Sequence, residues 1–224
     1  MKQTLFITGT DTGVGKTVLT TLLVRFLREC GVNVAALKPI CSGNRDDARK
    51  IFVATNKILP LDEINPWHFR APIAPLLAAR KENQRVRLSQ ALVHVRAMQK
   101  HFDVLVVEGA GGLLSPLGEN FGSRDLIVAL RAMPIIVAQN RLGAVNQVLL
   151  TLEALPKNLR AKTRVVLMSP RKPDAATNSN AKLLAEFFYT KKIFRLPWLG
   201  ENFAAARVLK NLAVRRTLEA LAAF

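Results

Sequence analysis

One glycine-rich stretch constrains the fold of this chain more than any other feature. Residues 9–17 read Gly-Thr-Asp-Thr-Gly-Val-Gly-Lys-Thr, after the apolar run Leu5-Phe6-Ile7 and before an apolar-periodic run over 18–27. A strand, a glycine-rich loop and a helix in this order are typical of a phosphate-binding loop. Glycine lets successive backbone N–H groups approach phosphate oxygens, and the dipole of the following helix favours the same anion. Five residues, not four, separate Gly9 from Gly15, so this loop is a variant of the usual one.

A second segment completes the predicted phosphate site. Residues 104–107 are four consecutive apolar residues, followed by Glu108 and the glycine-rich stretch 109–112, which we expect to form a flexible turn. Such a run predicts a buried parallel strand, and a carboxylate at its end commonly holds Mg²⁺ or its water. In the loop, Lys16 can reach the β- and γ-phosphates and the Thr17 hydroxyl can ligate Mg²⁺. We therefore expect Lys16, Thr17 and Glu108 to form a Mg²⁺–nucleotide core.

Predicted strands and helices alternate along the rest of the chain. The strands cover 32–37, 134–138, 164–168 and 193–196, and the helices cover 44–55, 88–102, 140–155, 175–189 and 208–222. Prolines between Pro60 and Pro75 exclude a long helix there, so this part is expected to be an ordered excursion near a site. The alternation predicts one α/β domain over residues 1–224, a three-layer fold of the P-loop type whose mostly parallel sheet is covered by helices on both faces.

The net charge of +17 is unusual for such a chain. The excess is steepest over 151–224, with 14 Lys and Arg against 5 Asp and Glu, but it forms no block of five or six like charges. Basic motifs interleaved with aromatic residues, as in nucleic-acid-binding modules, are also missing from the sequence. We therefore expect a solvated basic surface and no nucleic-acid partner.

Cysteine usage and hydropathy favour a cytoplasmic protein. Cys30 and Cys41 are too few for a disulfide framework or a zinc site, which favours a reducing compartment. Met1 to Thr4 lead directly into the first predicted strand, so we expect no signal peptide. Apolar runs are too short to span a bilayer, so no membrane association is expected.

Three further residues have more than one interpretation from the sequence alone. Lys38 follows the predicted strand 32–37, where side chains reach the binding edge of an open α/β sheet, but it could equally lie on the surface. Asp46 and Asp47 open the predicted helix 44–55, where acidic residues often serve only as partners of the helix dipole.

Four motifs together resemble the ATP-dependent dethiobiotin synthetases of biotin biosynthesis. They are the loop 9–17, Lys-Pro-Ile-Cys-Ser-Gly at 38–43, Val-Glu-Gly-Ala-Gly-Gly at 107–112 and Pro-Trp-Leu-Gly-Glu-Asn at 197–202. Their order and intervals are similar to those of the family, and the resemblance covers nearly the whole chain. It implies a cytoplasmic cyclo-ligase that converts 7,8-diaminononanoate, CO₂ and ATP into dethiobiotin, ADP and phosphate. The intermediates would be an N-carbamate and a carbamic–phosphoric mixed anhydride.

The resemblance also implies a role for each matching residue. Lys16 and Lys38 would be catalytic; Thr17, Asp47 and Glu108 would hold Mg²⁺, with Asp46 as the rival of Asp47; and Ser42 would bind the diamine or carbamate together with Lys38. The nucleotide would contact Thr12, Gly13, Val14, Gly15, Lys16, Thr17, Val18, Glu108, Gly109, Ala110, Gly111, Ser169, Pro197, Trp198 and Leu199. The family is homodimeric, and a helix amino end from the partner subunit holds the substrate carboxylate; the matching residues here are Gly143, Ala144, Val145 and Asn146. Ser169 stands where the family commonly has an Asn-Asp-like pair, which leaves the base preference open.

The main competing hypothesis is a partition-type P-loop positioning ATPase that binds DNA or a membrane. That family usually has a second lysine early in the loop, where this chain has Thr10, Asp11 and Thr12. The predicted terminal helix over 208–222 is also not a clearly basic amphipathic anchor.

Overall fold

A parallel β-sheet forms the centre of the molecule. The computed structural model describes residues 2–188, 192–200 and 203–223. Within these ranges six strands form one sheet in the order β10-β9-β8-β1-β5-β2, and every neighbouring pair is parallel. Their bounds are β1 (Gln3–Gly9), β2 (Val34–Leu37), β5 (Val104–Gly112), β8 (Met133–Gln139), β9 (Arg164–Met168) and β10 (Ile193–Leu196). The predicted strands are thus confirmed, with β9 and β10 at the predicted bounds.

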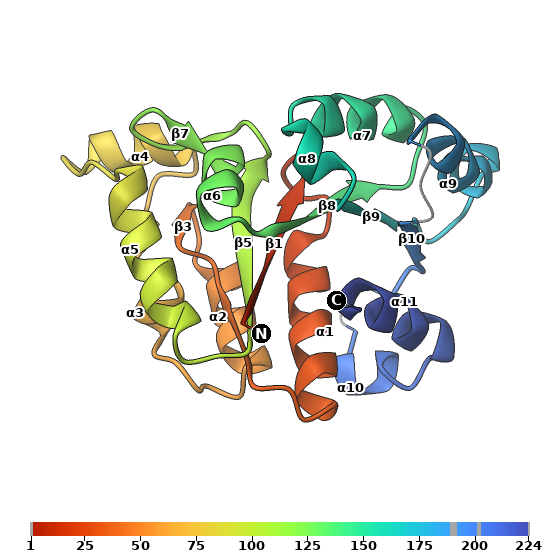
Figure 1. Cartoon of the computed structure of the whole chain (residues 1–224), viewed down its shortest axis with the longest axis horizontal. Helices are drawn as coiled ribbons and strands as arrows, with labels where there is room; N and C mark the ends of the chain where they lie inside the picture. Colours follow the sequence, from red (N-terminus) through yellow and green to blue (C-terminus); the bar gives the residue numbers. More distant parts are fainter. Residues whose placement is uncertain (1, 189–191, 201–202, 224) are drawn as a thin grey trace.

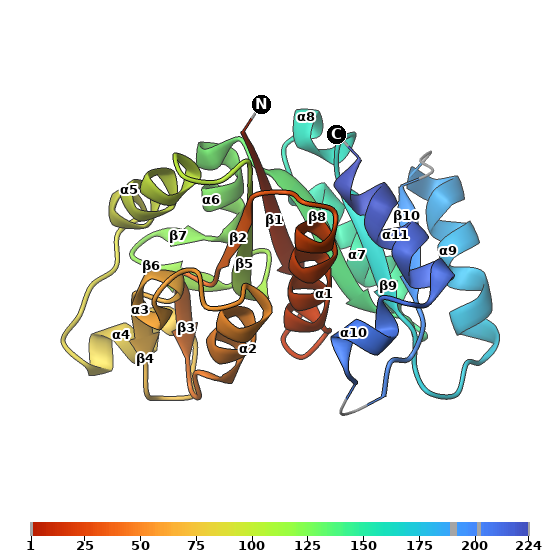
Figure 2. The same ribbon diagram turned by 90° about the horizontal axis from the view of Figure 1, so that it is seen from below.

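The sheet is buried on both faces because its strands are apolar on both faces. Leu5, Phe6 and Ile7 of β1 are fully buried, although neighbouring side chains of a strand point to opposite faces. Helices supply the cover: α1, α2 and α11 lie on one side of the sheet, and α5, α6 and α7 lie on the other (Figure 1 and Figure 2). The predicted three-layer α/β architecture is confirmed.

The described helices are mostly those that the sequence predicts. Their bounds are α1 (Lys16–Glu29), α2 (Asp46–Ala54), α3 (Leu61–Ile64), α4 (Pro75–Lys81), α5 (Leu88–Gln99), α6 (Ser123–Leu130), α7 (Ala144–Glu153), α8 (Lys157–Arg160), α9 (Ala175–Phe188), α10 (Ala205–Val208) and α11 (Leu212–Ala222). The predicted helix over 175–189 matches α9, and its last residue, Tyr189, lies outside the described residues. Helices α3, α6 and α8 are short elements that the sequence pattern did not predict.

Two predictions of local structure were wrong. The stretch 109–112 is not a turn but the end of β5, because Gly112 pairs with Gly9 of β1 beyond a register shift. The segment 208–222 is not one helix: it contains the end of α10 and all of α11. The Asn211 side chain accepts hydrogen bonds from the backbone N–H groups of Ala213 and Val214 and so begins a new helix.

The proline-rich excursion is ordered by one buried amide. Residues 40–42 form β3 (Ile40–Ser42), which pairs with β4 (Trp67–Phe69) in a separate two-stranded sheet. The fully buried Asn65 donates to the Lys38 carbonyl at 2.7 Å and accepts from Nε of Arg45 at 3.0 Å. These bonds fix the chain after β2 against the excursion. A further pair of short strands, β6 (Pro116–Gly118) and β7 (Phe121–Gly122), precedes α6.

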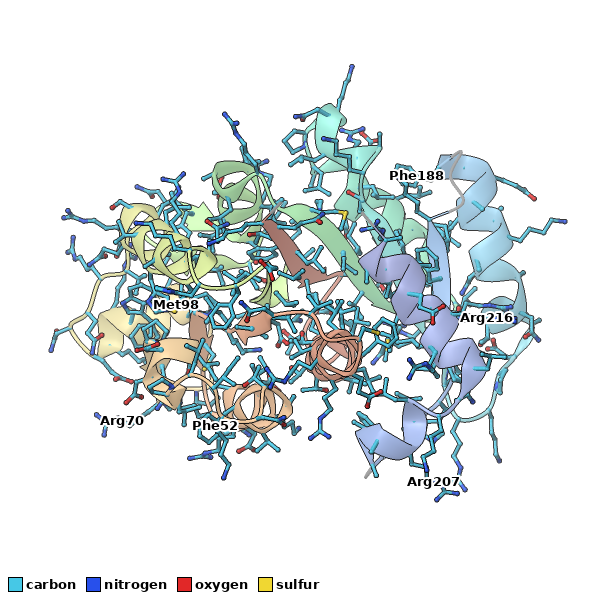
Figure 3. The ribbon with its side chains drawn as sticks, turned by 60° about the horizontal axis from the view of Figure 1, so that its bottom comes forward. Phe52, Arg70, Met98, Phe188, Arg207 and Arg216 are labelled. Carbon is cyan, nitrogen blue, oxygen red and sulfur yellow. The ribbon has the colours of Figure 1, made fainter. Side chains whose placement is uncertain are left out.

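The basic residues are spread over the molecule. Arg70 and Arg207 are both exposed and lie at opposite ends of the molecule (Figure 3). No described helix has the length and apolar character needed to cross a membrane.

Candidate active site

The glycine-rich loop connects β1 to α1 at the carboxyl edge of the sheet. Gly13 and Gly15 have φ angles of 72° and 102°, which residues with a Cβ rarely adopt, so these positions require glycine. Gly15 is also the N-cap of α1, and the first turn of this helix carries Lys16 and Thr17. The loop therefore presents its backbone and the amino end of a 14-residue helix to the same space, the arrangement that binds phosphate.

Lys16 is a buried ammonium group held by its own loop. Its Nζ donates to the Asp11 carbonyl oxygen at 2.9 Å, and the residue is only 6% exposed. Burial, and next the positive charge of Lys38, lower the pKa of Lys16 to about 8. An anion bound at the loop would relieve both effects.

The Glu108 carboxylate is buried below the loop and both of its oxygens are in use. Oε1 accepts from the Thr17 hydroxyl at 2.7 Å, and Oε2 accepts from the Thr20 hydroxyl at 2.6 Å. Lys38 Nζ donates to Oε1 as well, at 2.7 Å. Lys16, Thr17 and Glu108 thus lie together as the sequence predicts. Thr20 was missed: it follows Lys16 by four residues and Thr17 by three, a spacing that places all three on one side of α1.

Lys38 joins two carboxylates. Its Nζ lies 2.7 Å from Asp47 Oδ2 and 2.7 Å from Glu108 Oε1. Burial opposes the charge of Lys38, but Glu108 and then Asp47 outweigh it, so the pKa of Lys38 is raised. Burial likewise opposes ionisation of Asp47, but the Lys38 ammonium outweighs it and the pKa of Asp47 is lowered. Asp46, in contrast, contacts Arg49 at 3.1 Å on the surface, so Asp47 is the acid that faces the loop.

Two cavities meet at the loop. The first has a volume of about 410 Å³ and is lined by Gly13, Val14, Gly15, Val18, Gln139, Asn140, Arg141, Met168, Ser169, Pro170, Arg171, Pro197, Trp198, Leu199, Gly200 and Phe203. The second, of about 700 Å³, is lined by Thr12, Gly13, Gly15, Lys16, Thr17, Val18, Lys38, Cys41, Ser42, Asn44, Asp47, Lys50, Pro72, Ile73, Ala74, Pro75, Ala110, Gly111, Ser115 and Pro116. Both are lined by Gly13, Gly15 and Val18, so molecules bound in the two cavities would meet at the loop.

The first cavity is largely apolar and suits a planar ring. Ser169, Pro197, Trp198 and Leu199, all predicted from the sequence, line it. Met168 was missed. It ends β9, and a Cβ built on Gly15 would lie 3.1 Å from two Met168 side-chain atoms, so this side chain closely covers the loop.

The second cavity is lined by charged side chains. It is lined by Lys16, Lys38 and Lys50 and by one carboxylate, Asp47, while the buried Glu108 pairs with Lys38 from behind the lining. Three ammonium groups near two carboxylates leave an excess of positive charge, which favours anionic ligands. The Ser42 hydroxyl points to its wall and donates to the Ile73 carbonyl at 2.6 Å. The wall from Pro72 to Pro75 was not predicted, because only the folded excursion brings it to the loop. Asn44, Lys50 and Ser115 also line this cavity and were not predicted, because the sequence pattern does not indicate which residues near α2 and after β5 face the loop.

Some predicted residues lie elsewhere. Gly109 lines neither cavity: it is buried, and a Cβ there would meet Ser123 Oγ at 2.5 Å, so glycine serves close packing. Residues 143–146, predicted to bind a substrate carboxylate in a partner subunit, also line neither cavity; they form the N-cap and first turn of α7. Glu201 and Asn202 of the fourth motif lie outside the described residues.

Comparisons with known proteins agree with this geometry. A family model described as an AAA domain matches residues 3–203. An ATP-dependent dethiobiotin synthetase of Anaeromyxobacter dehalogenans (strain 2CP-1) is 38% identical over 213 residues, which cover 93% of this chain and 96% of that protein. The enzyme of the same name from Akkermansia muciniphila is 37% identical over 186 residues, covering 83% of this chain and 87% of that protein.

A solved structure supports the fold. The pNOB8 ParA protein bound to nonspecific DNA superposes with a TM-score of 0.59 over 99% of this chain and 98% of that one, at 13% identity. At that identity the likeness is one of fold alone. The curated relatives, in contrast, are similar in sequence over almost their full length, and this chain belongs to the family of ATP-dependent dethiobiotin synthetases.

Proposed function

We propose that this protein closes the cyclic urea of dethiobiotin from 7,8-diaminononanoate and CO₂, with conversion of ATP to ADP and phosphate. The two cavities meet at Gly13, Gly15 and Val18, and this arrangement supports the proposal most directly. A nucleotide in the first cavity would direct its phosphates along the loop toward a second ligand in the cationic second cavity. The family to which the chain belongs supports the identity of the substrates.

The nucleotide would lie with its base in the first cavity. Trp198 and Met168 would pack against the ring, and Ser169 offers one hydroxyl for a base edge. The phosphates would follow the backbone of residues 12–17 and reach the Lys16 ammonium. An amide holds a donor group and an acceptor at separate fixed positions, whereas a hydroxyl is a single group that can rotate to donate or accept, so we expect weak discrimination between ATP and other triphosphates.

The proposed reaction depends on electrostatic stabilisation by positive charge more than on covalent catalysis. The amine of the diamine and CO₂ would form an N-carbamate, whose oxygen attacks the γ-phosphorus while the bond to the ADP oxygen breaks. The second amine then attacks the carbonyl carbon, phosphate leaves and the ring closes. Carbamate and triphosphate are both anionic, and Lys16 and Lys38 lie where they can neutralise them.

The oxygen atoms around Lys38 fit a magnesium ion. Thr17 Oγ1, Asp47 and Glu108 supply hard oxygen donors, and the position of the Lys38 ammonium between the two carboxylates supports a cation-binding role for them. No cluster of three or more His, Cys, Asp or Glu side chains occurs among the described residues. Mg²⁺ usually keeps several waters and binds phosphate oxygens besides one or two carboxylates. Bound Mg²⁺ would neutralise charge on the β- and γ-phosphates.

The substrate would occupy the second cavity, with Lys38 and Ser42 near its reacting end. We further propose a cytoplasmic homodimer in which residues 143–146 of a partner subunit hold the substrate carboxylate. The left-handed N-cap Gly143 (φ 88°) and the exposed Leu142 at the start of α7 support this surface. Analytical ultracentrifugation of the protein, together with an Asn146→Ala variant assayed for its KM for the diamine, tests the dimer and this contact.

The decisive experiment measures ADP and phosphate release with Mg²⁺ and bicarbonate, with and without 7,8-diaminononanoate. ATP, CTP and GTP are compared, and the product is identified by mass spectrometry. We expect diamine-dependent release and a product with the mass of dethiobiotin, both lost in Lys16→Met. Nucleotide turnover that ignores the diamine, or that is stimulated by DNA, would contradict the proposal and favour a positioning ATPase.

A further inference from the structure

The Lys38 ammonium group occupies the position at which the proposed function requires a metal ion. Lys38 Nζ lies 2.7 Å from Asp47 Oδ2 and 2.7 Å from Glu108 Oε1, the two carboxylates proposed to hold Mg²⁺. The side chains of Lys38 and Glu108 are 6% and 0% exposed, so this is not a loose surface pair. The Thr17 hydroxyl donates to the same Glu108 oxygen.

The ammonium and a metal ion exclude each other from this position. Protein-bound Mg²⁺ lies about 2.0–2.1 Å from its oxygen ligands, closer than the ammonium lies to either carboxylate. Two cations sharing Glu108 Oε1 would also repel strongly, because water is largely excluded there. The repulsion favours the departure of one cation when the other binds.

Lys38 borders a cavity into which it can move, and Glu108 has a second hydrogen bond that holds it in place. Lys38 lines the second cavity, so its side chain can turn away from the carboxylates toward a ligand there. Glu108 Oε2 is held by the Thr20 hydroxyl at 2.6 Å, and Thr20 is fully buried beneath the carboxylate. This bond does not involve Lys38, so an exchange of cations at Oε1 leaves it intact.

We propose that the Lys38 ammonium is the resident cation of the metal site, that it leaves Asp47 and Glu108 when Mg²⁺ binds, and that Thr20 is the positioning residue that holds Glu108 through the exchange. The inference rests on the proposed magnesium site. Without metal, Lys38 compensates a buried carboxylate and is itself neutralised. With metal, its positive charge becomes available to the anionic carbamate. The enzyme would thus expose its substrate-facing lysine only after the metal has bound.

Metal binding to nucleotide-free protein tests the exchange directly. Mn²⁺, a paramagnetic substitute for Mg²⁺, is titrated into the wild type and the Lys38→Met variant, and free Mn²⁺ is followed by electron paramagnetic resonance. Since wild-type binding must displace an ammonium group, we expect Lys38→Met to bind Mn²⁺ about tenfold or more tightly. Lys50→Met is the control: it removes a lysine from the same cavity but not from the carboxylate pair, and should change the affinity by about twofold or less.

Thermal unfolding provides a second readout if the variant folds poorly without metal. Lys38→Met leaves Glu108 without its cation, so its midpoint should be lower than that of the wild type and should rise more on addition of Mg²⁺. Lys38→Gln keeps a hydrogen-bond donor without the charge and should behave in the same direction. Equal or weaker Mn²⁺ binding by both variants, with no larger Mg²⁺-dependent rise, overturns the exchange.

The Thr20 role is tested in the Lys38→Met background. Thr20→Val removes the hydroxyl at nearly constant shape and should abolish most of the gain in Mn²⁺ affinity, whereas Thr20→Ser should keep it. If Val and Ser bind Mn²⁺ equally, Thr20 does not position Glu108. Diamine-dependent turnover by the wild type together with unchanged Mn²⁺ affinity in Lys38→Met would refute only the exchange; absence of diamine-dependent turnover would refute the proposed function.

Discussion

Nucleotide binding by this protein should take up a proton at Lys16. Burial and the neighbouring Lys38 charge lower the pKa of the Lys16 ammonium to about 8 in the nucleotide-free protein. A bound triphosphate places negative charge against this group and raises its pKa. At pH values above 8, an uncharged Lys16 must therefore gain a proton when the nucleotide binds.

The size of the effect follows from the pKa of about 8. At pH 8.5 roughly three-quarters of the free protein carries an uncharged Lys16, so binding takes up about 0.75 proton, against about 0.1 proton at pH 7. Affinity should be about 30-fold weaker at pH 9.5 than at pH 7 from this group alone. Folding stability depends on pH in the opposite direction to nucleotide affinity. Between pH 8 and 10.5 the unfolded chain binds more protons at Lys16 than the native state does, so the contribution of Lys16 to the free energy of unfolding rises with pH.

Calorimetric titration with a non-hydrolysable ATP analogue measures the proton uptake, because the apparent enthalpy changes with the ionisation enthalpy of the buffer. Lys16→Arg is the matched control, since a guanidinium keeps the charge and does not titrate in this range. Protons that come from the nucleotide or from other groups are common to both proteins. Equal uptake by the two proteins at pH 8.5 would refute the assignment of a lowered pKa to Lys16.

Three further predictions concern the geometry of the site. Gly15→Ala places a Cβ 3.1 Å from Met168 side-chain atoms at a φ of 102°, and this strain should lower the free energy of unfolding by about 1–3 kcal/mol and raise the KM for ATP. An unchanged melting temperature and KM would show that the loop tolerates the side chain. Asn65→Ala leaves buried polar partners unpaired and should lower the free energy of unfolding in urea by about 2–3 kcal/mol; a loss below about 0.5 kcal/mol would contradict the bonding described for this amide. Asp47→Asn should raise the Mg²⁺ concentration for half-maximal turnover about tenfold or more, while Asp46→Asn should stay within about twofold; the reverse order would make Asp46 the ligand.

The fold was largely predictable because the residues of each sheet strand indicate that the strand is buried on both faces. A strand covered on both faces must be apolar at successive residues, and β1, β5 and β8 show this pattern in the sequence. The loop was predictable for a different reason: glycine is favoured where φ is positive, and Gly13 and Gly15 are such positions. Both signals are local, so no knowledge of neighbouring segments was required.

The short elements were not predictable in the same way. The bounds of β3 and β4 depend on their pairing with each other across about 25 residues of chain, and α6 has only eight residues to show a period. The break before α11 depends on whether the Asn211 side chain caps a helix or faces solvent. Such choices are made by contacts that a single-sequence pattern does not encode.

The phosphate loop, its lysine and the carboxylate at the end of a core strand were predictable from the amino-acid sequence alone, because local backbone requirements fix these groups. The contacts of Asp47 rather than Asp46 with Lys38, of Thr20 with Glu108 and of Met168 with Gly15 follow from the packing of separate segments of the chain. The physical reason is distance along the chain: Thr20 and Glu108 are 88 residues apart, and Lys38 and Glu108 are 70 apart. Parallel strands bring their carboxyl ends to one edge, and packing then selects which side chains touch.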